Sequence, residues 1–244
     1  MKNLKYIIPI FLILYDFGYS LSEYNFDLSG LSPLTDTEIE NAKSYIDSLD
    51  VLLPTDESSL RGDFSEFKHN MITAIINRDT SFIFSILDSS ILNSFGGNGG
   101  IHEFKTMWKI ENDHSEFWIL FKESFELGGT FTDDTLTFEF PYVSTTFPDN
   151  YDSFSYGALI KEDAIIYLSP NKDLKFHSAS YTIFRILQWT DLDCRRQEEF
   201  IPVLVSKNRY GFVHTSDFRS PLDYRGRFIY QSNSWKLTFF VAGD

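Results

Sequence analysis

A glycine-rich segment is the part of this chain whose residue types and spacing best suit ligand chemistry. Residues 94–108 read SFGGNGGIHEFKTMW, so Gly96, Gly97 and Gly100 stand just before a helix-like pattern. Such glycines let backbone N–H groups point into one concavity, and the N-terminus of the following helix adds positive partial charge, which suits an anion. A phosphate loop would place Lys, Ser or Thr after the glycines. Here Glu103 falls in the first helical turn instead and would repel a bound anion.

We therefore interpret the glycine segment as a steep turn. In this interpretation the glycines let Phe95 and Trp108 pack closely against each other. In the alternative interpretation the loop binds a ligand, and Gly96, Gly97, Gly100 and Trp108 are candidate contacts.

An enzyme built on this loop would use His102, Glu103 and Asp88. A general base needs an acid or a nucleophile within hydrogen-bond reach, and Asp88 is the nearest candidate in sequence. A simpler explanation for Asp88 is that its side chain caps the turn in which it stands. The five histidines lack zinc-protease spacing, and Glu66-x-x-His69 has no second copy to complete a di-iron site. The sequence predicts no metal site and no cofactor.

Near the end of the chain, a charged cluster stands in the segment SPLDYRGRF. Asp223, Tyr224 and Arg225 are candidate contacts for a polar ligand. We favour a structural role, in which Asp223 and Arg225 pair with each other or with the helical part of the chain.

Composition and charge restrict the class of partner. The chain has 244 residues, 43% hydrophobic and 17% aromatic, which is enough to bury a sizeable core. Its net charge of −14 repels phosphate backbones and anionic lipid surfaces, so nucleic acid is not expected as a partner. Cys194 is the only cysteine and excludes an internal disulfide. Its charged surroundings favour a thiol in a surface loop over a catalytic nucleophile.

The first twenty residues have the layout of a secretory signal peptide. Lys2 and Lys5 precede an apolar run over 6–15, and Gly18-Tyr19-Ser20 offers a cleavage site. The run is too short for a membrane span, which needs about 20 apolar residues. The sequence thus predicts cleavage after residue 20, export to the periplasm or the exterior, and no membrane span afterwards. An uncleaved N-terminal anchor is the alternative.

The spacing of apolar residues changes along the mature chain. After a leader over 21–33, helical periodicity predicts a mainly helical domain over 34–143, beginning with a capping box at Thr35 and Glu38. A polar linker is expected over 144–155. Short strands, ending in a hairpin around the turn Ser232–Ser234, fill 156–244. The predicted fold class is α+β.

The run EFIPVLVSKNRYGFVHTSDFRSP resembles a bacterial SH3 (SH3b) domain. Tyr210, Gly211, Phe212 and Val213 fit the aromatic-Gly-aromatic-Val strand of that family, and 164–170 fits its opening strand and first loop. The whole chain resembles uncharacterised secreted bacterial proteins that carry such a domain at the C-terminus, through landmarks that include FGG at 95–97 and LGG at 127–129. The resemblance implies a small β-barrel.

SH3b domains often bind cell-wall peptides or tether a catalytic domain, but no recognisable hydrolase domain precedes this one. We therefore expect a non-catalytic, exported binding module for a cell-envelope peptide, glycan or protein, with Tyr210 and Phe212 among the candidate ligand contacts. The alternative is an enzyme of unknown class at the Gly96–Gly100 loop.

Overall fold

The structure is a computed structural model that describes residues 32–132, 134–170, 172–187 and 199–243. Within these ranges the fold is α+β, as predicted, and contains three sheets, none of which closes into a barrel. The expected signal peptide and Cys194 lie outside the described residues. None of the helices in these ranges is both long enough and apolar enough to cross a membrane.

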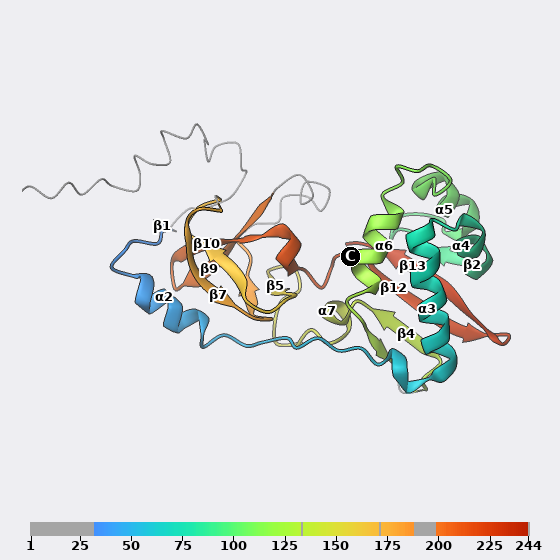
Figure 1. The fold of residues 1–244 in the computed structure, drawn as a ribbon, viewed down its shortest axis with the longest axis horizontal. Coiled ribbons are helices and arrows are strands. Elements are labelled where there is room, and N and C mark those ends of the chain that lie inside the picture. Colours follow the sequence, from blue (N-terminus) through green and yellow to red (C-terminus); the bar gives the residue numbers. More distant parts are fainter. Residues whose placement is uncertain (1–31, 133, 171, 188–198, 244) are drawn as a thin grey trace, which may run out of the picture.

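The described residues form two lobes that lie side by side (Figure 1). We call the first the α/β lobe; it consists of the described residues from 57 to 146 and of residues 220–243. We call the second the β lobe; it consists of residues 32–51 and of the described residues from 155 to 219. The chain therefore passes between the lobes three times within the described ranges, over 52–56, 147–154 and around 220.

The α/β lobe has a five-stranded sheet in the order β2-β13-β12-β4-β3, with helices packed on it. Its strands are β2 (Leu87–Leu92), β3 (Thr130–Phe131), β4 (Thr137–Phe140), β12 (Arg225–Gln231) and β13 (Ser234–Val241). Its helical elements are η2 (Ser58–Leu60), α3 (Gly62–Asn77), α4 (Thr80–Ile86), α5 (Gly100–Trp108), α6 (Phe117–Phe125) and α7 (Tyr142–Thr145).

Local signals fix several of these helix ends. The Asp79 carboxylate accepts a hydrogen bond from the backbone N–H of Phe82, 3.0 Å away, and so caps α4. After α6, Gly128 adopts a φ of +79°, a conformation that glycine reaches without strain and that ends the helix. Both were helix boundaries that the sequence predicted.

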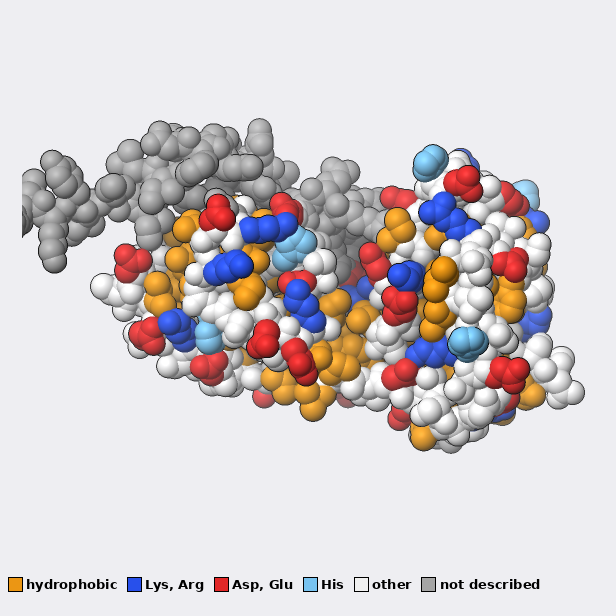
Figure 2. All heavy atoms as spheres, viewed as in Figure 1, with side chains coloured by type: hydrophobic (Ala, Val, Ile, Leu, Met, Phe, Trp, Pro, Cys, Tyr) orange, Lys and Arg blue, Asp and Glu red, His pale blue; other side chains and the backbone are white. Residues whose placement is uncertain are grey.

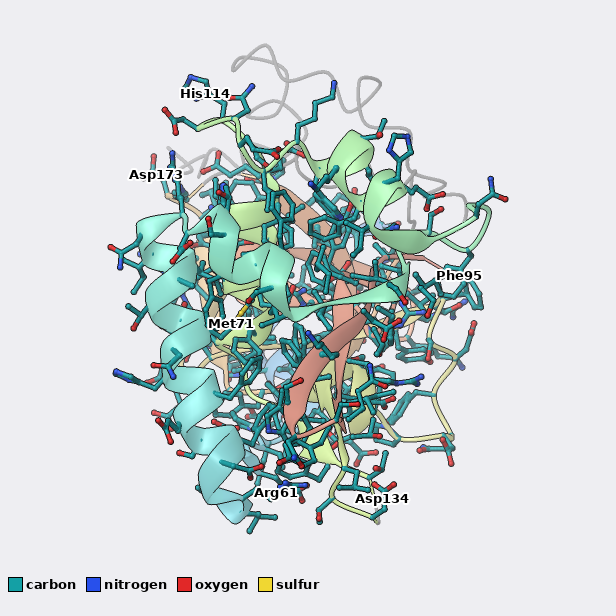
Figure 3. The ribbon with its side chains drawn as sticks, turned by 90° about the vertical axis from the view of Figure 1, so that its right-hand side faces the viewer. Arg61, Met71, Phe95, His114, Asp134 and Asp173 are labelled. Carbon is teal, nitrogen blue, oxygen red and sulfur yellow. The ribbon has the colours of Figure 1, made fainter. Side chains whose placement is uncertain are left out.

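Phenylalanine rings fill the space between the helices and the sheet of the α/β lobe. Their contacts are mostly edge-to-face or tilted, the arrangements that aromatic quadrupoles favour. Met71 lies on the core-facing side of α3, the helix that covers one side of the sheet in Figure 3, and it adds to this core. Each buried ring contributes about 1.5–3 kcal/mol. The fully buried rings are Phe64, Phe104, Phe117, Phe121, Phe125, Phe138, Phe140, Phe228 and Phe240.

The β lobe contains two further sheets. In one, β10 pairs with β9 along one side and with β1 and β6 along the other, and β6 continues to β7; the second has the order β11-β5-β8. An isolated bridge between Ile186 and Val203 connects the two sheets. The strands are β1 (Ser32–Pro33), β5 (Tyr156–Leu159), β6 (Ala164–Tyr167), β7 (Lys175–Ala179), β8 (Ile183–Arg185), β9 (Phe200–Ser206), β10 (Arg209–His214) and β11 (Phe218–Arg219); η4 (Thr215–Asp217) precedes β11.

Two segments lie in a different lobe from the one that the order of predicted elements suggests. Helix α2 (Ile39–Ile46) buries Ala42 and Ile46 in the core of the β lobe, not among the other helices. The β12–β13 hairpin pairs with β4 and β2 of the α/β lobe, not with the strands that precede it. Hydrophobic periodicity shows that an element has a face to bury, but it does not identify the partner.

A small apolar cluster joins the lobes. Leu52, Tyr142 and Ile183 are buried in it, and Phe147 and Tyr151 of the expected linker pack against it. The linker predicted over 144–155 therefore coincides with one of the three passages between the lobes. The expected leader ends in β1, which pairs in parallel with β10.

Candidate functional site

The glycine segment forms an anion cradle that the protein's own Glu103 already occupies. The Glu103 Oε2 atom accepts hydrogen bonds from the backbone N–H groups of Asn98 and Gly99, at 2.8 and 3.1 Å. Its Oε1 atom accepts a bond of 3.3 Å from the side-chain amide of buried Asn93. The carboxylate was expected to repel a bound anion; in the structure it takes the anion's place. The arrangement supports a structural role for this loop.

The turn depends on glycine for two reasons: a positive φ at Gly99 and Gly100, and a close approach of the Glu103 side chain at Gly97. Gly99 and Gly100 have φ values of +72° and +86°, where a side chain is strained. At Gly97 an added Cβ would press on both carboxylate oxygens of Glu103, with 2.7 Å to Oε2. Gly96 has no neighbouring atom within 4 Å of such a Cβ.

The expected contact between Phe95 and Trp108 is not formed. The Trp108 ring packs instead on Phe117, Tyr224 and Phe240, with centroid distances of 5.4–5.6 Å. Phe95 is 51% exposed at the edge of the lobe (Figure 3). The Arg225 guanidinium lies 5.5 Å from its ring centre. Because Trp108 is buried in the core of the α/β lobe, it is not available to a ligand.

The three candidate catalytic residues are not joined to one another. Asp88 accepts hydrogen bonds from the backbone and hydroxyl groups of Ser90 and from Gln231, and these bonds, chiefly that from the Ser90 hydroxyl, lower the pKa of its carboxyl group. His102 is exposed on α5. Among the described residues no hydrogen bond links any two of Asp88, His102 and Glu103. The structure thus shows no acid–base pair at the glycine loop.

Tyr210 and Phe212 lie inside the β lobe. Both are 3% exposed, and their rings meet edge-to-face at 5.6 Å in a small cluster with Tyr167 and Phe200. Burial raises the pKa of the Tyr210 hydroxyl. In the described structure these two rings form core contacts and do not line a groove.

The charged segment around residue 223 is built around Arg219, which no motif in the sequence singles out. Arg219 is 8% exposed; its guanidinium donates to the Ser124 hydroxyl at 2.6 Å and to the Tyr224 carbonyl at 2.8 Å. Asp223 lies 3.9 Å from it and also accepts a bond from the backbone of Ser220. Arg225 donates to the Gly243 carbonyl. Because Arg219 comes from β11 and Ser124 from α6, their hydrogen bond joins the two lobes.

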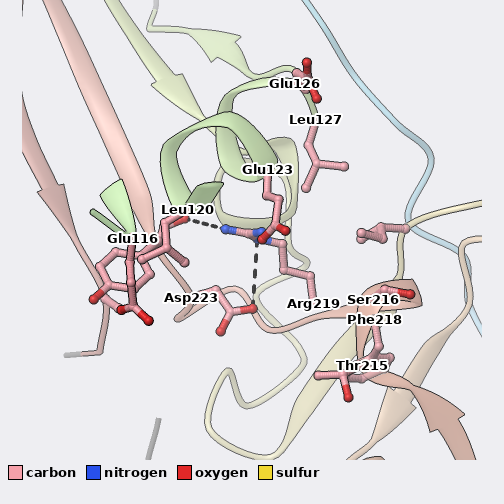
Figure 4. Close-up of a pocket in the computed structure, with 13 residues that line it drawn as sticks. Glu116, Leu120, Glu123, Glu126, Leu127, Thr215, Ser216, Phe218, Arg219 and Asp223 are labelled. Carbon is pink, nitrogen blue, oxygen red and sulfur yellow. Dashed lines mark hydrogen bonds and ion pairs between the residues drawn. The ribbon is translucent and has the colours of Figure 1, made fainter. Parts of the chain in front are cut away.

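A cleft of about 490 Å³ lies between the lobes beside this arginine (Figure 4). Its α/β-lobe wall is one face of α6 and its flanks, where Glu116, Leu120 and Glu123 follow at helical spacing. Thr215, Ser216 and Phe218 from the β lobe form the other wall. Further lining residues are Glu126, Leu127, Ile160, Arg219, Asp223, Tyr224 and Ala242.

The cleft is predominantly acidic. Its lining contains Glu116, Glu123, Glu126 and Asp223, against the single base Arg219. Of the acidic groups, Asp223 lies beside Arg219, and Glu126 is 3.8 Å from Lys122. Electrostatic attraction at this cleft therefore favours a positively charged or amine-bearing ligand. Among the predicted ligand residues, the structure brings Asp223 and Tyr224 to it and leaves the glycine loop elsewhere.

No group of three or more His, Cys, Asp or Glu side chains is placed to hold a metal ion in the described ranges. Comparison of the chain with known protein families, curated proteins and solved structures finds no match.

Proposed function

We propose that this protein is an exported, non-catalytic binding protein of the bacterial cell envelope, whose ligand lies in the acidic cleft between the lobes. The ligand is a peptide or glycan that carries amino groups, either free or on an envelope protein. The observation that carries the proposal is the cleft itself. Its volume of about 490 Å³ lies within the ordinary range for ligand sites, which often form between domains.

The chemistry of the lining supports binding more than turnover. Arg219 and Asp223 contact each other, and Arg219 also bonds to Ser124, so both are held in fixed positions. Glu123 is exposed at the wall, and no hydrogen bond or ion pair connects it with another described residue. A carboxylate in this position can pair with a ligand's ammonium group without first giving up a protein partner.

The SH3-like nature of the β lobe is part of the proposal. The motif over 210–213 lies in β10, the strand with three neighbours, and the strand that resembles the family's opening strand, β6, pairs with it. The proposed likeness concerns this pairing of strands, because none of the sheets in the described ranges closes into a barrel.

Binding is tested with purified mature protein and isolated envelope fragments. We expect retention that falls as salt rises, since screening weakens charge pairing. Glu123→Gln should weaken retention by about three- to tenfold, the effect of roughly 1 kcal/mol. Glu111→Gln, the same change at an exposed glutamate outside the cleft, is the matched control. Equal retention of both variants, or no retention of the wild type, contradicts the proposed site.

Export is tested separately. Mass spectrometry of the protein recovered from the periplasm or the medium should find a chain that begins at about Leu21. Recovery of a chain with an intact Met1 contradicts cleavage.

A further inference from the structure

Aromatic side chains gather on the surface where residues 147–156 pass between the lobes. The ring centre of Tyr151 lies 5.0 Å from that of Tyr156 and 6.2 Å from that of Phe147. Phe154 stands on the turn between the two tyrosines and is 60% exposed. We call Phe147, Tyr151, Phe154 and Tyr156 the aromatic strip. Figure 2 shows hydrophobic side chains gathered at the lower edge of the molecule, between the two lobes.

A second segment adds to this surface. Residues 50–53 pass the same joint, and Leu52 is buried in the cluster on which Phe147, Tyr151 and Tyr156 pack. Its neighbours Val51 and Leu53 are 54% and 63% exposed. Single exposed apolar residues are ordinary, but several on adjoining segments mark an interaction surface.

The strip has an acidic border. Asp50 accepts a hydrogen bond of 2.6 Å from the Tyr151 hydroxyl. This bond is the main reason why the pKa of the Tyr151 phenol rises to about 12. The Oδ1 atom of Asp50 accepts no hydrogen bond from another described residue. Asp149 and Asp152 are exposed on the segment that carries the strip. Arg185 is a basic neighbour of the strip, because the register of β5 and β8 places it opposite Tyr156.

We propose that the aromatic strip and Asp50 form a docking surface for a basic segment of a protein partner. A Lys or Arg side chain of that segment lies over the Tyr151 and Tyr156 rings, and its charge is met by Asp50 and Asp149. Tyrosine rings attract cations through their faces, and tyrosines are frequent among the residues that dominate interface energies. The excess of carboxylates selects a basic partner over an acidic one. This inference does not depend on whether the cleft binds a ligand.

The inference is tested with fluorescently labelled twelve-residue peptides that alternate Arg with apolar residues, and with the same peptides carrying Glu in place of Arg. Fluorescence anisotropy on the whole mature protein should show binding of the basic peptides and at least about tenfold weaker binding of the acidic ones. Phe154→Ala and Asp149→Asn alter exposed side chains, so both variants should fold normally. Phe154→Ala should weaken binding at least about fivefold, as expected of an interface anchor. Asp149→Asn should weaken it less, about twofold.

Glu111→Gln, at an exposed glutamate outside both the strip and the cleft, distinguishes this surface from general attraction to an acidic protein. Unchanged affinity in that variant, together with the loss in Phe154→Ala, supports the strip. The proposal is overturned by equal weakening in Phe154→Ala, Asp149→Asn and Glu111→Gln, by unchanged binding in Phe154→Ala, or by no binding of the basic peptides. Concentration-dependent dimerisation that Phe154→Ala abolishes also overturns it, because the strip is then covered by a second copy of the chain.

Discussion

The Gly97→Ala substitution tests the claim that Glu103 is the internal anion of the glycine loop. The added methyl group would occupy the space of the Glu103 carboxylate and displace it from the backbone N–H groups of Asn98 and Gly99. Hydrogen bonds to charged groups contribute about 1.5–3 kcal/mol each, but Glu103 is partly exposed and water replaces part of this. We therefore expect a loss of about 2 kcal/mol, or about 4–8 °C in melting temperature.

A double-mutant cycle shows whether the loss passes through Glu103. Glu103→Ala alone should also cost about 2 kcal/mol, because it removes the same hydrogen bonds. In the Glu103→Ala background, Gly97→Ala should then cost almost nothing, which gives a coupling energy of about 2 kcal/mol. Urea unfolding monitored by tryptophan fluorescence measures all four proteins, since Trp108 lies in the same lobe.

Gly96→Ala is the matched control. An added Cβ meets no atom within 4 Å there, so the substitution should leave stability unchanged or raise it by up to about 1 kcal/mol. Losses that add to within about 0.5 kcal/mol in the double mutant would refute the coupling through Glu103. So would a loss at Gly96 equal to that at Gly97.

Three further predictions follow from other contacts. Gly100→Ala should lower the free energy of unfolding by about 1–2 kcal/mol, since the φ of Gly100 is +86°. His102→Ala should leave the melting temperature unchanged. An unchanged stability in Gly100→Ala contradicts the geometry of the turn. Arg219→Ala should lower the free energy of unfolding in urea by about 3 kcal/mol, because it leaves the buried Asp223 without its neighbouring positive charge. Asp223→Ala in the same background should recover part of this loss. A loss below about 1 kcal/mol in Arg219→Ala contradicts the role of that charge. Hydrogen bonds from Arg209 and from Thr35 lower the pKa of the Glu38 carboxyl group to about 2. This carboxylate therefore stabilises the fold at pH values above its ordinary pKa of 4.5. The stabilisation is lost as the pH falls from 4.5 towards 2. Thermal melts of Glu38→Gln should therefore show a weaker dependence on pH over that window than the wild type, and identical slopes exclude the linkage.

Local signals predicted individual elements well. The cap at Asp79, the apolar positions of α6 and the turn at Ser232 and Asn233, both of which have positive φ, all appear in the structure where the sequence indicates them. Each depends on residues within a few positions of one another. Strand β2, in contrast, has the short sequence LDSSIL and pairs in parallel with β13, far along the chain. Nothing in the sequence near β2 signals that partner.

The cleft was beyond local reasoning for the same reason. Arg219 stands in a short strand of one lobe and meets Ser124 of a helix in the other, 95 residues away in sequence. The spacing of Glu116, Leu120 and Glu123 could have marked an acidic face on a helix whose phenylalanines are buried. It could not have shown what stands opposite that face.

The position of the β12–β13 hairpin has a consequence for how the protein is made. The two strands lie inside the sheet, between β2 and β4, yet the ribosome synthesises them after every other strand of that sheet. Until residue 241 has been synthesised, the phenylalanine rings of α3 and α6 lack Phe228 and Phe240, and the lobe cannot close. A truncation in front of residue 225 removes two strands from a lobe whose other elements end at residue 145.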